Sequence, residues 1–312
     1  MNKCRVTSSI QETSVTGSQT ANTDYDRAND MDSRLITTYE PDNSLKKGYR
    51  NVFPEIFNEL NANRWLIFQL FKKDFLALYK QSFIGFMWAV IIPLITVGTF
   101  VVLNGSGVFN AGAITVPYAL YAVLGVAIWQ LFSAGLIASS NSLVLAGPMI
   151  TKINFSRKSL VVASLGQSIL SFSIQFCLVV VLLLYFRFVP SAWILLLPVM
   201  IIPTILLTLG LGFILSLLNG ILRDIGNLLS ICMTLLLFLT PILYAKPTTG
   251  ILAVVSSYNP LYYLVGVPRD LVLMGTTFEW RGFALSSALA ATVFLICLML
   301  FHLTETRVTE RI

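Results

Sequence analysis

Charged side chains are scarce in this sequence of 312 residues: Asp, Glu, Lys and Arg together make up 12% of it. A soluble globular domain carries about 25%, because its surface faces water. Hydrophobic residues supply 56% of the sequence, and the mean hydropathy is +0.78. This composition excludes an ordinary soluble domain and indicates a chain whose surface faces lipid. At about 20 residues for each membrane span, the length leaves room for about six spans.

Groups that carry acid-base or metal chemistry are equally sparse. His302 is the single histidine, and the four cysteines stand far apart without a CxxC pair, which supports neither a disulfide framework nor a zinc site. The acids beyond residue 63 are scattered: Asp74, Asp224, Asp270, Glu279, Glu305 and Glu310. The phosphate-binding motif GxxxxGK followed by Ser or Thr is missing. We therefore expect no catalytic site, no metal and no cofactor in this chain; if it belongs to an active pump, ATP would be bound elsewhere.

Basic residues outnumber acidic ones, and the net charge is +6. The charges are not clustered on a foldable soluble module, which argues against nucleic acid as a partner. Residues 1–53 are rich in Ser, Thr, Asn, Gln and Asp and contain no apolar run. This segment is predicted to be a disordered cytoplasmic tail without a secretory signal.

From residue 54 to 81 apolar residues recur every three or four positions with basic residues between them, which is typical of an amphipathic helix. The apolar positions are Phe57, Leu60, Phe68, Phe71, Phe75 and Leu78. Such a helix can lie in the lipid headgroup region or pack on a partner protein. The basic residues and the aromatic stripe favour the headgroup region, but the period itself fits both.

Long uncharged runs after residue 81 predict six membrane spans. They lie near residues 83–103, 117–143, 159–186, 188–222, 225–245 and 282–304. Residues 250–275 are apolar but interrupted by Pro260, Gly266 and Pro268, so we expect two short re-entrant helices there. The predicted fold class is all-α: residues 82–312 form a polytopic domain of six transmembrane helices, preceded by the amphipathic helix.

The basic residues divide unequally between the two sides of this topology. Of fourteen Lys and Arg residues beyond residue 63, ten fall on one side: Arg64, Lys72, Lys73, Lys80, Lys152, Arg157, Lys158, Arg223, Arg307 and Arg311. The other side holds Arg187, Lys246, Arg269 and Arg281. By the positive-inside rule the first side is cytoplasmic. Both termini are therefore predicted to lie in the cytoplasm, with the spans in the cytoplasmic (inner) membrane.

Small polar residues form two helical stripes inside the predicted spans. The stripes are Ser164, Ser168, Ser171 and Gln175 in the third span, and Thr204, Thr208, Gly212 and Ser216 in the fourth. Residues of this size let helices approach closely and form hydrogen bonds between them, so packing within the chain is the favoured interpretation. The alternative is that one stripe lines a wet pathway or a dimer seam.

Aromatic residues gather toward the predicted outer side and in the first two spans. They include Trp88, Tyr118, Tyr121, Trp129, Phe132, Tyr244 and Tyr262. The simpler interpretation is an aromatic belt at the membrane interface. Aromatic rings also bind the apolar faces of sugars, so a pathway for a glycan is the alternative. Composition alone favours the belt.

Two further features concern charged and exposed positions. The segment 148–158 mixes apolar with basic residues, which predicts a docking helix for a cytoplasmic partner, although a loop whose side chains snorkel into the membrane would fit too. Its candidates for contact with the partner are Met149, Lys152, Phe155, Arg157 and Lys158. The adjacent pairs Arg223 with Asp224 and Arg269 with Asp270 lie near the membrane and are structural or gating candidates.

Several motifs occur in a specific order and spacing. They are Lys73-Asp74-Phe75 with Tyr79 and Trp88; Pro117-Tyr118 with Tyr121, Gly125 and Trp129; Arg223-Asp224-Ile225; Thr240-Pro241-Ile242 with Tyr244; and Asn259-Pro260 before Arg269. On these residues, the sequence from about Phe57 to its end resembles the membrane permeases of ABC exporters for polysaccharides and polyol phosphates. That family moves O-antigen, capsule and teichoic-acid chains.

The resemblance implies the transmembrane subunit of an ATP-driven exporter for a lipid-linked polysaccharide. Such a subunit pairs with a second copy and with two nucleotide-binding ABC subunits, in contact with membrane lipids. Residues 54–81 would be the gate helix, 148–158 the coupling loop and 250–275 the outer re-entrant segment. The seven aromatic residues named above become candidates for the substrate pathway. The gating candidates become Lys73, Asp74, Arg223, Asp224 and Arg269.

One motif departs from the family, which usually has Phe-Pro-Arg-Glu where this chain has Phe155-Ser156-Arg157-Lys158. The partner's docking surface is therefore expected to be more acidic.

Two other functions are compatible with the spans. A drug or lipid exporter would share this architecture, whereas an integral membrane transferase acting on lipid-linked sugars would need clustered acids or histidines, which are scarce here.

Overall fold

The computed structural model describes residues 52–80, 87–107, 112, 114–147, 156–277 and 279–308. Most of these residues lie in helices. These described residues contain no strand, so the prediction of an all-α fold is confirmed for them. All of them belong to the unit Lys47–Ile312. Almost all of the predicted cytoplasmic tail, and residues 148–155 of the predicted coupling loop, lie outside the described residues.

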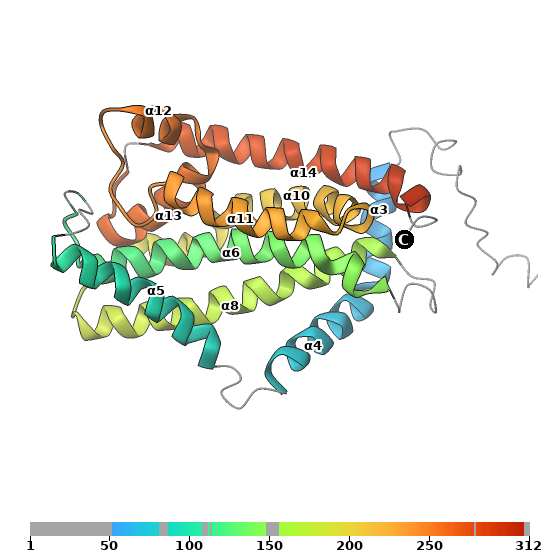
Figure 1. Ribbon diagram of the computed structural model, residues 1–312, viewed down its shortest axis with the longest axis horizontal. Coiled ribbons are helices and arrows are strands. Elements are labelled where there is room, and N and C mark those ends of the chain that lie inside the picture. Colours follow the sequence, from blue (N-terminus) through green and yellow to red (C-terminus); the bar gives the residue numbers. More distant parts are fainter. Residues whose placement is uncertain are drawn as a thin grey trace, which may run out of the picture. The chain divides into compact units, whose positions relative to one another are not determined.

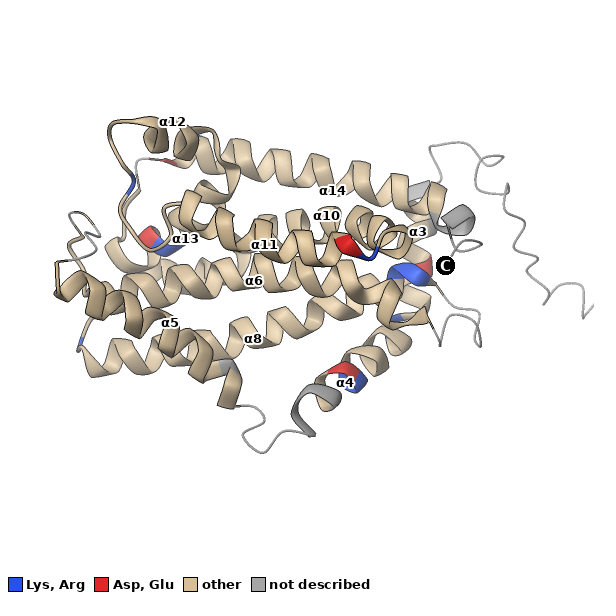
Figure 2. Ribbon diagram, viewed as in Figure 1, with Lys and Arg blue, Asp and Glu red and all other residues tan. Residues whose placement is uncertain are grey.

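Four long helices run side by side in Figure 1. They are α6 (Tyr118–Leu145), α8 (Arg157–Tyr185), α10 (Ile202–Ile221) and α14 (Trp280–Val308). Helix α6 packs against α8 and α10, and α10 packs against α14. Short turns of η3 (Ala192–Leu196) and α9 (Leu197–Met200) extend α10 at its start. Figure 2 shows that charged residues gather toward the two ends of these helices and leave their middle stretches free of charge.

By length and composition, the described residues contain four helical segments suited to crossing a membrane, or five if a bent pair is counted, against the predicted six. Four segments among the described residues are long and apolar enough: Tyr118–Leu145, Arg157–Tyr185, Ala192–Ile221 and Trp280–Thr304. A fifth is possible if α12 (Ile251–Tyr258) and α13 (Pro260–Met274), which meet at 83°, count as one broken span. Helices α5 (Trp88–Gly105) and α11 (Asp224–Leu239) coincide with the first and fifth predicted spans but are shorter.

Helix α11 ends six residues before the predicted end of the fifth span, Ala245. Thr240 leaves the helical conformation at φ −97° and ψ 126°. It precedes Pro241, whose ring disfavours the helical conformation in the residue before it. The helix therefore ends before the apolar run does, because a continuous apolar run does not reveal a backbone break at proline.

The predicted amphipathic helix consists of two helices, α3 (Val52–Ala62) and α4 (Arg64–Lys80). They meet at Asn63, whose side-chain amide donates a hydrogen bond to the Glu59 carbonyl oxygen at 2.9 Å. Ile56 and Leu70 are buried in a cluster with side chains of α6, α8, α10 and α14. Trp65 and Phe68 are exposed. The apolar positions thus serve two surfaces, one inside the chain and one outside it.

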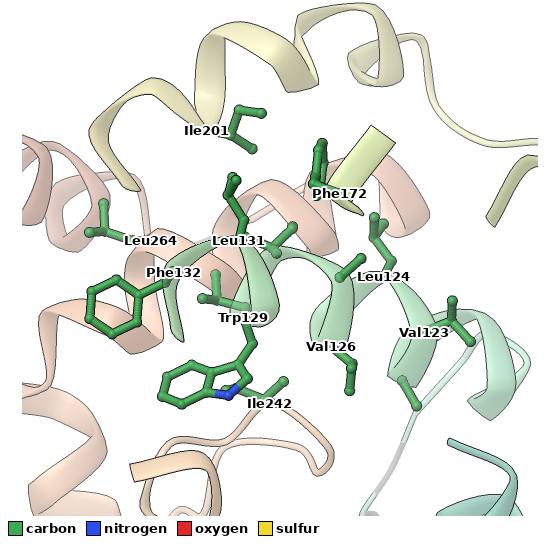
Figure 3. Packing of buried hydrophobic residues seen from close by; sticks show 14 of the residues in the cluster. Val123, Leu124, Val126, Trp129, Leu131, Phe132, Phe172, Ile201, Ile242 and Leu264 are labelled. Carbon is green, nitrogen blue, oxygen red and sulfur yellow. The ribbon is translucent and has the colours of Figure 1, made fainter. Parts of the chain in front are cut away.

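The main core surrounds α6, which is buried along most of its length. Figure 3 shows α6 side chains reaching several neighbouring segments, including those that carry Phe172, Ile201, Ile242 and Leu264. Glycine allows the close approach of α8 and α10 to α6. A β-carbon on Gly135 would lie 2.8 Å from the Ser168 hydroxyl oxygen, and one on Gly212 would lie 2.7 Å from the Ser139 β-carbon.

The two predicted polar stripes lie mostly within this helix packing. Ser164, Ser168 and Gln175 of α8 are buried, and so are the four stripe residues of α10, Thr204, Thr208, Gly212 and Ser216. Most of their hydroxyl groups donate to carbonyl oxygens one turn earlier, as Thr208 does to Thr204 at 2.7 Å. The favoured interpretation, packing within the chain, accounts for both stripes in this structure.

Candidate functional site

A buried arginine organises the predicted outer end of the helices. Arg269 of α13 is 1% exposed. Its Nε donates to the Asp270 carboxylate at 2.9 Å, and its Nη1 donates to the Ile242 carbonyl oxygen at 2.8 Å. Its Cζ lies 3.7 Å from the centre of the Tyr121 ring. The charge is therefore satisfied by a carboxylate, a carbonyl and an aromatic face together.

The segment 240–244 lies at the centre of this cluster. Because the chain leaves the helical conformation before Pro241, the carbonyl groups that follow need donors from elsewhere. The Tyr118 hydroxyl donates to the Leu243 carbonyl oxygen at 2.9 Å, and the Tyr121 hydroxyl donates to that of Tyr244 at 3.3 Å. Two tyrosines of α6 thereby fix the segment that follows α11.

Local sequence features place Arg269 in the cluster. Helix α13 begins at Pro260, and its cap is Asn259, whose side-chain oxygen accepts a hydrogen bond from the Leu261 amide at 3.0 Å. The Asn259 amide group also donates to the Thr240 hydroxyl at 2.8 Å. A β-carbon on Gly125 would lie 3.0 Å from the Ile242 carbonyl oxygen. These contacts explain why Thr240, Gly125 and Asn259 occur together in the motifs noted above.

The aromatic candidates for a pathway occupy different surroundings. Tyr121, Trp129, Phe132 and Tyr262 are buried in the single chain, and the rings of Trp129 and Phe132 lie 5.7 Å apart. Trp88 on α5 is 44% exposed. Tyr244 is partly buried, and its hydroxyl donates to the Phe238 carbonyl oxygen at 2.8 Å. The structure thus brings Tyr118, Tyr121 and Tyr244 together, while Trp88 lies on another helix.

Sequence reasoning missed an ion pair in the same outer region. The Lys246 ammonium lies 2.6 Å from the Glu279 carboxylate and 4.8 Å from the centre of the Tyr262 ring. It joins the loop after α11 to the start of α14. No periodic signal in the sequence connects the two residues, because both lie in short segments between helices.

A second ion pair lies at the predicted cytoplasmic end. The Lys158 ammonium lies 2.9 Å from the Glu59 carboxylate, and the Lys158 side chain is fully buried. Lys158 was predicted to contact a partner subunit; in the single chain it joins the start of α8 to α3. Arg157 is the other described coupling candidate and is partly buried beside it. Met149, Lys152 and Phe155 lie outside the described residues.

The remaining gating candidates fall in two places. Arg223 and Asp224 are exposed at the start of α11, where the Asp224 carboxylate suits the positive end of the helix dipole. Lys73 and Asp74 lie on α4 and line a cavity of about 560 Å³ between α4, α6 and α8. Partial burial raises the pKa of the Asp74 carboxyl, and nearby Lys73 opposes this rise.

These groups hold helices together and show no arrangement for bond-breaking chemistry. Within the described ranges, no three His, Cys, Asp or Glu side chains gather as a metal site would require. The polar contacts at both ends join segments that are far apart in the sequence. What the arrangement can do is keep two ends of a set of apolar helices in a defined conformation.

Comparison with known proteins identifies the family to which the chain belongs. Residues 66–273 match the family described as ABC-2 type transporter. The chain belongs to this family. It is 26% identical over 249 residues to the O-antigen export system permease protein RfbA of Klebsiella pneumoniae, an alignment that covers 78% of this chain and 94% of that protein. It is 24% identical to the protein of the same name from Myxococcus xanthus, over 70% of this chain and 88% of that protein.

Members of the ABC-2 type transporter family are membrane subunits of transporters, which agrees with the apolar helices described above. The resemblance inferred from the motifs is thereby confirmed at the level of the family. The matched region begins within α4 and ends within α13, so it includes the Arg269 cluster and the α4 cavity.

Proposed function

We propose that this chain is the transmembrane subunit of an ATP-driven ABC exporter that moves a lipid-linked polysaccharide across the cytoplasmic membrane. The observation that carries the proposal is the similarity to O-antigen export permeases, which extends over 94% of one of them. The scarcity of acid-base groups supports a transport role rather than chemistry on the glycan. ATP and Mg are bound by a separate nucleotide-binding subunit in this proposal.

The working unit contains two copies of this chain and two nucleotide-binding subunits. Helices α5 and α11 present exposed apolar side chains, among them Ile92, Ile95, Leu235 and Phe238. Phe100 of α5 and Phe238 of α11 lie 6.5 Å apart, so the two helices are neighbours. This apolar face is the proposed seam between the copies, and Trp88 is the pathway candidate that is exposed beside it.

The proposed topology has six spans with both termini in the cytoplasm. At 1.5 Å per residue the 16 residues of α11 are about 24 Å long, so the segment 240–244 completes the crossing. Helices α12 and α13, with their 83° bend, are the proposed re-entrant segment. Reporter fusions at Asn110 and at the C-terminus test this topology: opposite signals are expected, and equal signals would reject it.

Coupling to ATP hydrolysis uses the segment 148–158 and the Lys158–Glu59 ion pair. When the nucleotide-binding subunit displaces this segment, the start of α8 moves with it. The ion pair transmits this movement to α3 and α4. The work comes from a difference in the affinity of the partner for two conformations of the membrane subunit.

A double substitution tests this assignment. Phe155→Ala with Arg157→Ala should leave ATPase activity and the membrane dimer intact while export of the lipid-linked glycan stops. Arg187→Ala, a substitution at the opposite end of α8, is the matched control and should export normally. Full export by the double variant would reject the coupling role. Purified alone in vesicles, the chain should hydrolyse no ATP, and hydrolysis by this chain would reject the proposed division of labour.

A further inference from the structure

The α4 cavity has the features of a binding site for a small amphiphile. Its volume of about 560 Å³ falls within the usual range for ligand pockets, roughly 300–1,000 Å³. Leu70, Ile137 and Leu160 give it an apolar wall, and it is open on one side. Asn141 and Gln167 add amide groups to the wall.

The position of the cavity points to the membrane as the source of its ligand. It lies where α6 ends and α8 begins, which is the end of the helices opposite to Arg269. In the proposed topology this is the level of the cytoplasmic headgroups. A second, smaller cavity of about 110 Å³ lies farther along α6 and α8 and shares Ala134 with the first. Trp88, Ile92 and Pro93 of α5 form its third wall.

The two cavities together are at least as deep as one leaflet. Their lining residues on α8 run from Leu160 to Gln175, a rise of about 22 Å, against roughly 15 Å for half of the hydrocarbon core. The smaller cavity is bounded by the hydrogen bond from Gln175 to Gln130, at 2.7 Å. Because α6 and α8 are in close contact at Gly135 and Ser168, a ligand held here has no way between these helices. The site suits a resident ligand better than a transported one.

Two adjacent charges at the mouth define the headgroup. Lys73 and Asp74 both line the cavity from α4, and Lys73 is exposed while Asp74 is half-buried. A phosphate suits Lys73, and a primary ammonium suits Asp74. An anionic headgroup without an ammonium would place negative charge against Asp74. An uncharged apolar ligand would cover both charges without pairing either of them.

We propose that the α4 cavity holds one phospholipid of the cytoplasmic leaflet whose headgroup carries both a phosphate and an ammonium, as phosphoethanolamine does. The phosphate binds Lys73, the ammonium binds Asp74, and one acyl chain lies along α6 and α8. The lipid fills the space between α4 and the two long helices and thereby holds α4 in place. The depth of the site depends on the proposed topology, whereas its charge pattern does not.

Lipid retention by the purified full-length chain tests the proposal. The protein is reconstituted in nanodiscs of equal amounts of phosphatidylethanolamine and phosphatidylglycerol, released gently, and its bound lipids are counted by native mass spectrometry. The wild type should retain the ethanolamine lipid by about threefold over the glycerol lipid, the size expected of one exposed ion pair. Asp74→Asn should remove this preference, and Lys73→Gln should reduce retention of both lipids.

The chain offers matched controls for each change. Lys72→Gln removes a neighbouring exposed lysine that does not line the cavity, and it should retain lipid as the wild type does. Ala138→Leu should fill the cavity and expel the lipid, whereas Ala288→Leu on the exposed side of α14 should not.

Three outcomes would overturn the proposal: equal retention in the wild type, Lys73→Gln and Asp74→Asn proteins; a preference for phosphatidylglycerol; or loss of lipid in Lys72→Gln as large as in Lys73→Gln. If Ala138→Leu does not fold, the charge variants decide. The measurement needs no ATPase partner and no glycan, so its failure is separate from failure of the proposed function.

Discussion

The Arg269 guanidinium carbon lies 3.7 Å from the centre of the Tyr121 ring, and both residues are almost completely buried. They belong to α13 and α6, which are separated in the sequence by α8, η3, α9, α10, α11 and α12. A buried cation in an apolar protein is costly unless it is paired, and here the ring, the Asp270 carboxylate and the Ile242 carbonyl share that role. The contact therefore fixes the arrangement of three segments at the predicted outer end.

Arg269→Gln should destabilise the purified protein by about 3 kcal/mol, because it leaves Asp270 and the Ile242 carbonyl without their cation. Thermal unfolding in detergent measures the effect. Arg281→Gln, which changes an exposed arginine at the same end, should have little effect. A melting temperature for Arg269→Gln equal to that of Arg281→Gln would contradict the structural role of the cluster.

Gly125→Ala should lower stability by about 1–3 kcal/mol through crowding. Its methyl group would lie 3.0 Å from the Ile242 carbonyl oxygen and 3.4 Å from the Arg269 side chain. Gly98→Ala on α5 is the control, because no atom lies within 4 Å of its new methyl group. Both variants are compared by thermal unfolding. If the two variants have the same melting temperature, the segment 240–244 does not approach α6 as closely as described.

Glu59→Gln should destabilise the junction of α3 with α8 by up to about 3 kcal/mol, since the Lys158 charge stays buried. Adding Lys158→Met removes that charge and should restore part of the stability lost in Glu59→Gln. Glu279→Gln breaks the half-exposed pair with Lys246 and should cost at most about 1 kcal/mol. Thermal unfolding of the four proteins measures the differences. A double variant less stable than Glu59→Gln would argue against loss of the Lys158–Glu59 ion pair as the cause.

Lowering the pH should tighten the packing of α4. Burial raises the pKa of the Asp74 carboxyl in the folded state, with Lys73 as the opposing charge. When α4 is docked, the Asp74 carboxyl therefore stays protonated to a higher pH than when α4 is detached. The docked conformation gains stability as the pH falls and loses it as the pH rises. Hydrogen exchange of lipid-free protein, corrected for intrinsic rates, should show stronger protection of α4 at about pH 5 than at about pH 7.5. Asp74→Asn should show no such difference.

Much of the helical architecture could be predicted because apolar runs and charge placement depend only on neighbouring residues. Each of the six predicted ranges overlaps at least one helix of the described residues, but the fourth contains η3, α9 and α10 in succession. The end of α11 did not follow from hydropathy, since Pro241 interrupts an apolar run. Apolar residues recur with a helical period throughout the segment 54–81, so the sequence pattern did not predict the break between α3 and α4 at Asn63.

The contacts at both ends of the helices could not be predicted in the same way. Periodicity assigns a residue to a face of its helix but does not say which other helix that face meets. Gly125 and Asn259 were noted as parts of motifs, yet only the structure shows that both contact the segment 240–244. Lys158 was assigned to a partner surface because it belongs to a segment that mixes apolar with basic residues, and periodicity could not reveal its pairing with Glu59, which is 99 residues away.

The close contacts of Gly135 with Ser168 and of Gly212 with Ser139 have a mechanical consequence. Because the helices are in tight contact at these crossing points, α6, α8 and α10 are expected to move as one rigid body during a transport cycle. Strain would then be taken up at the less extensively packed helices α5 and α11, whose junctions with that body would act as hinges.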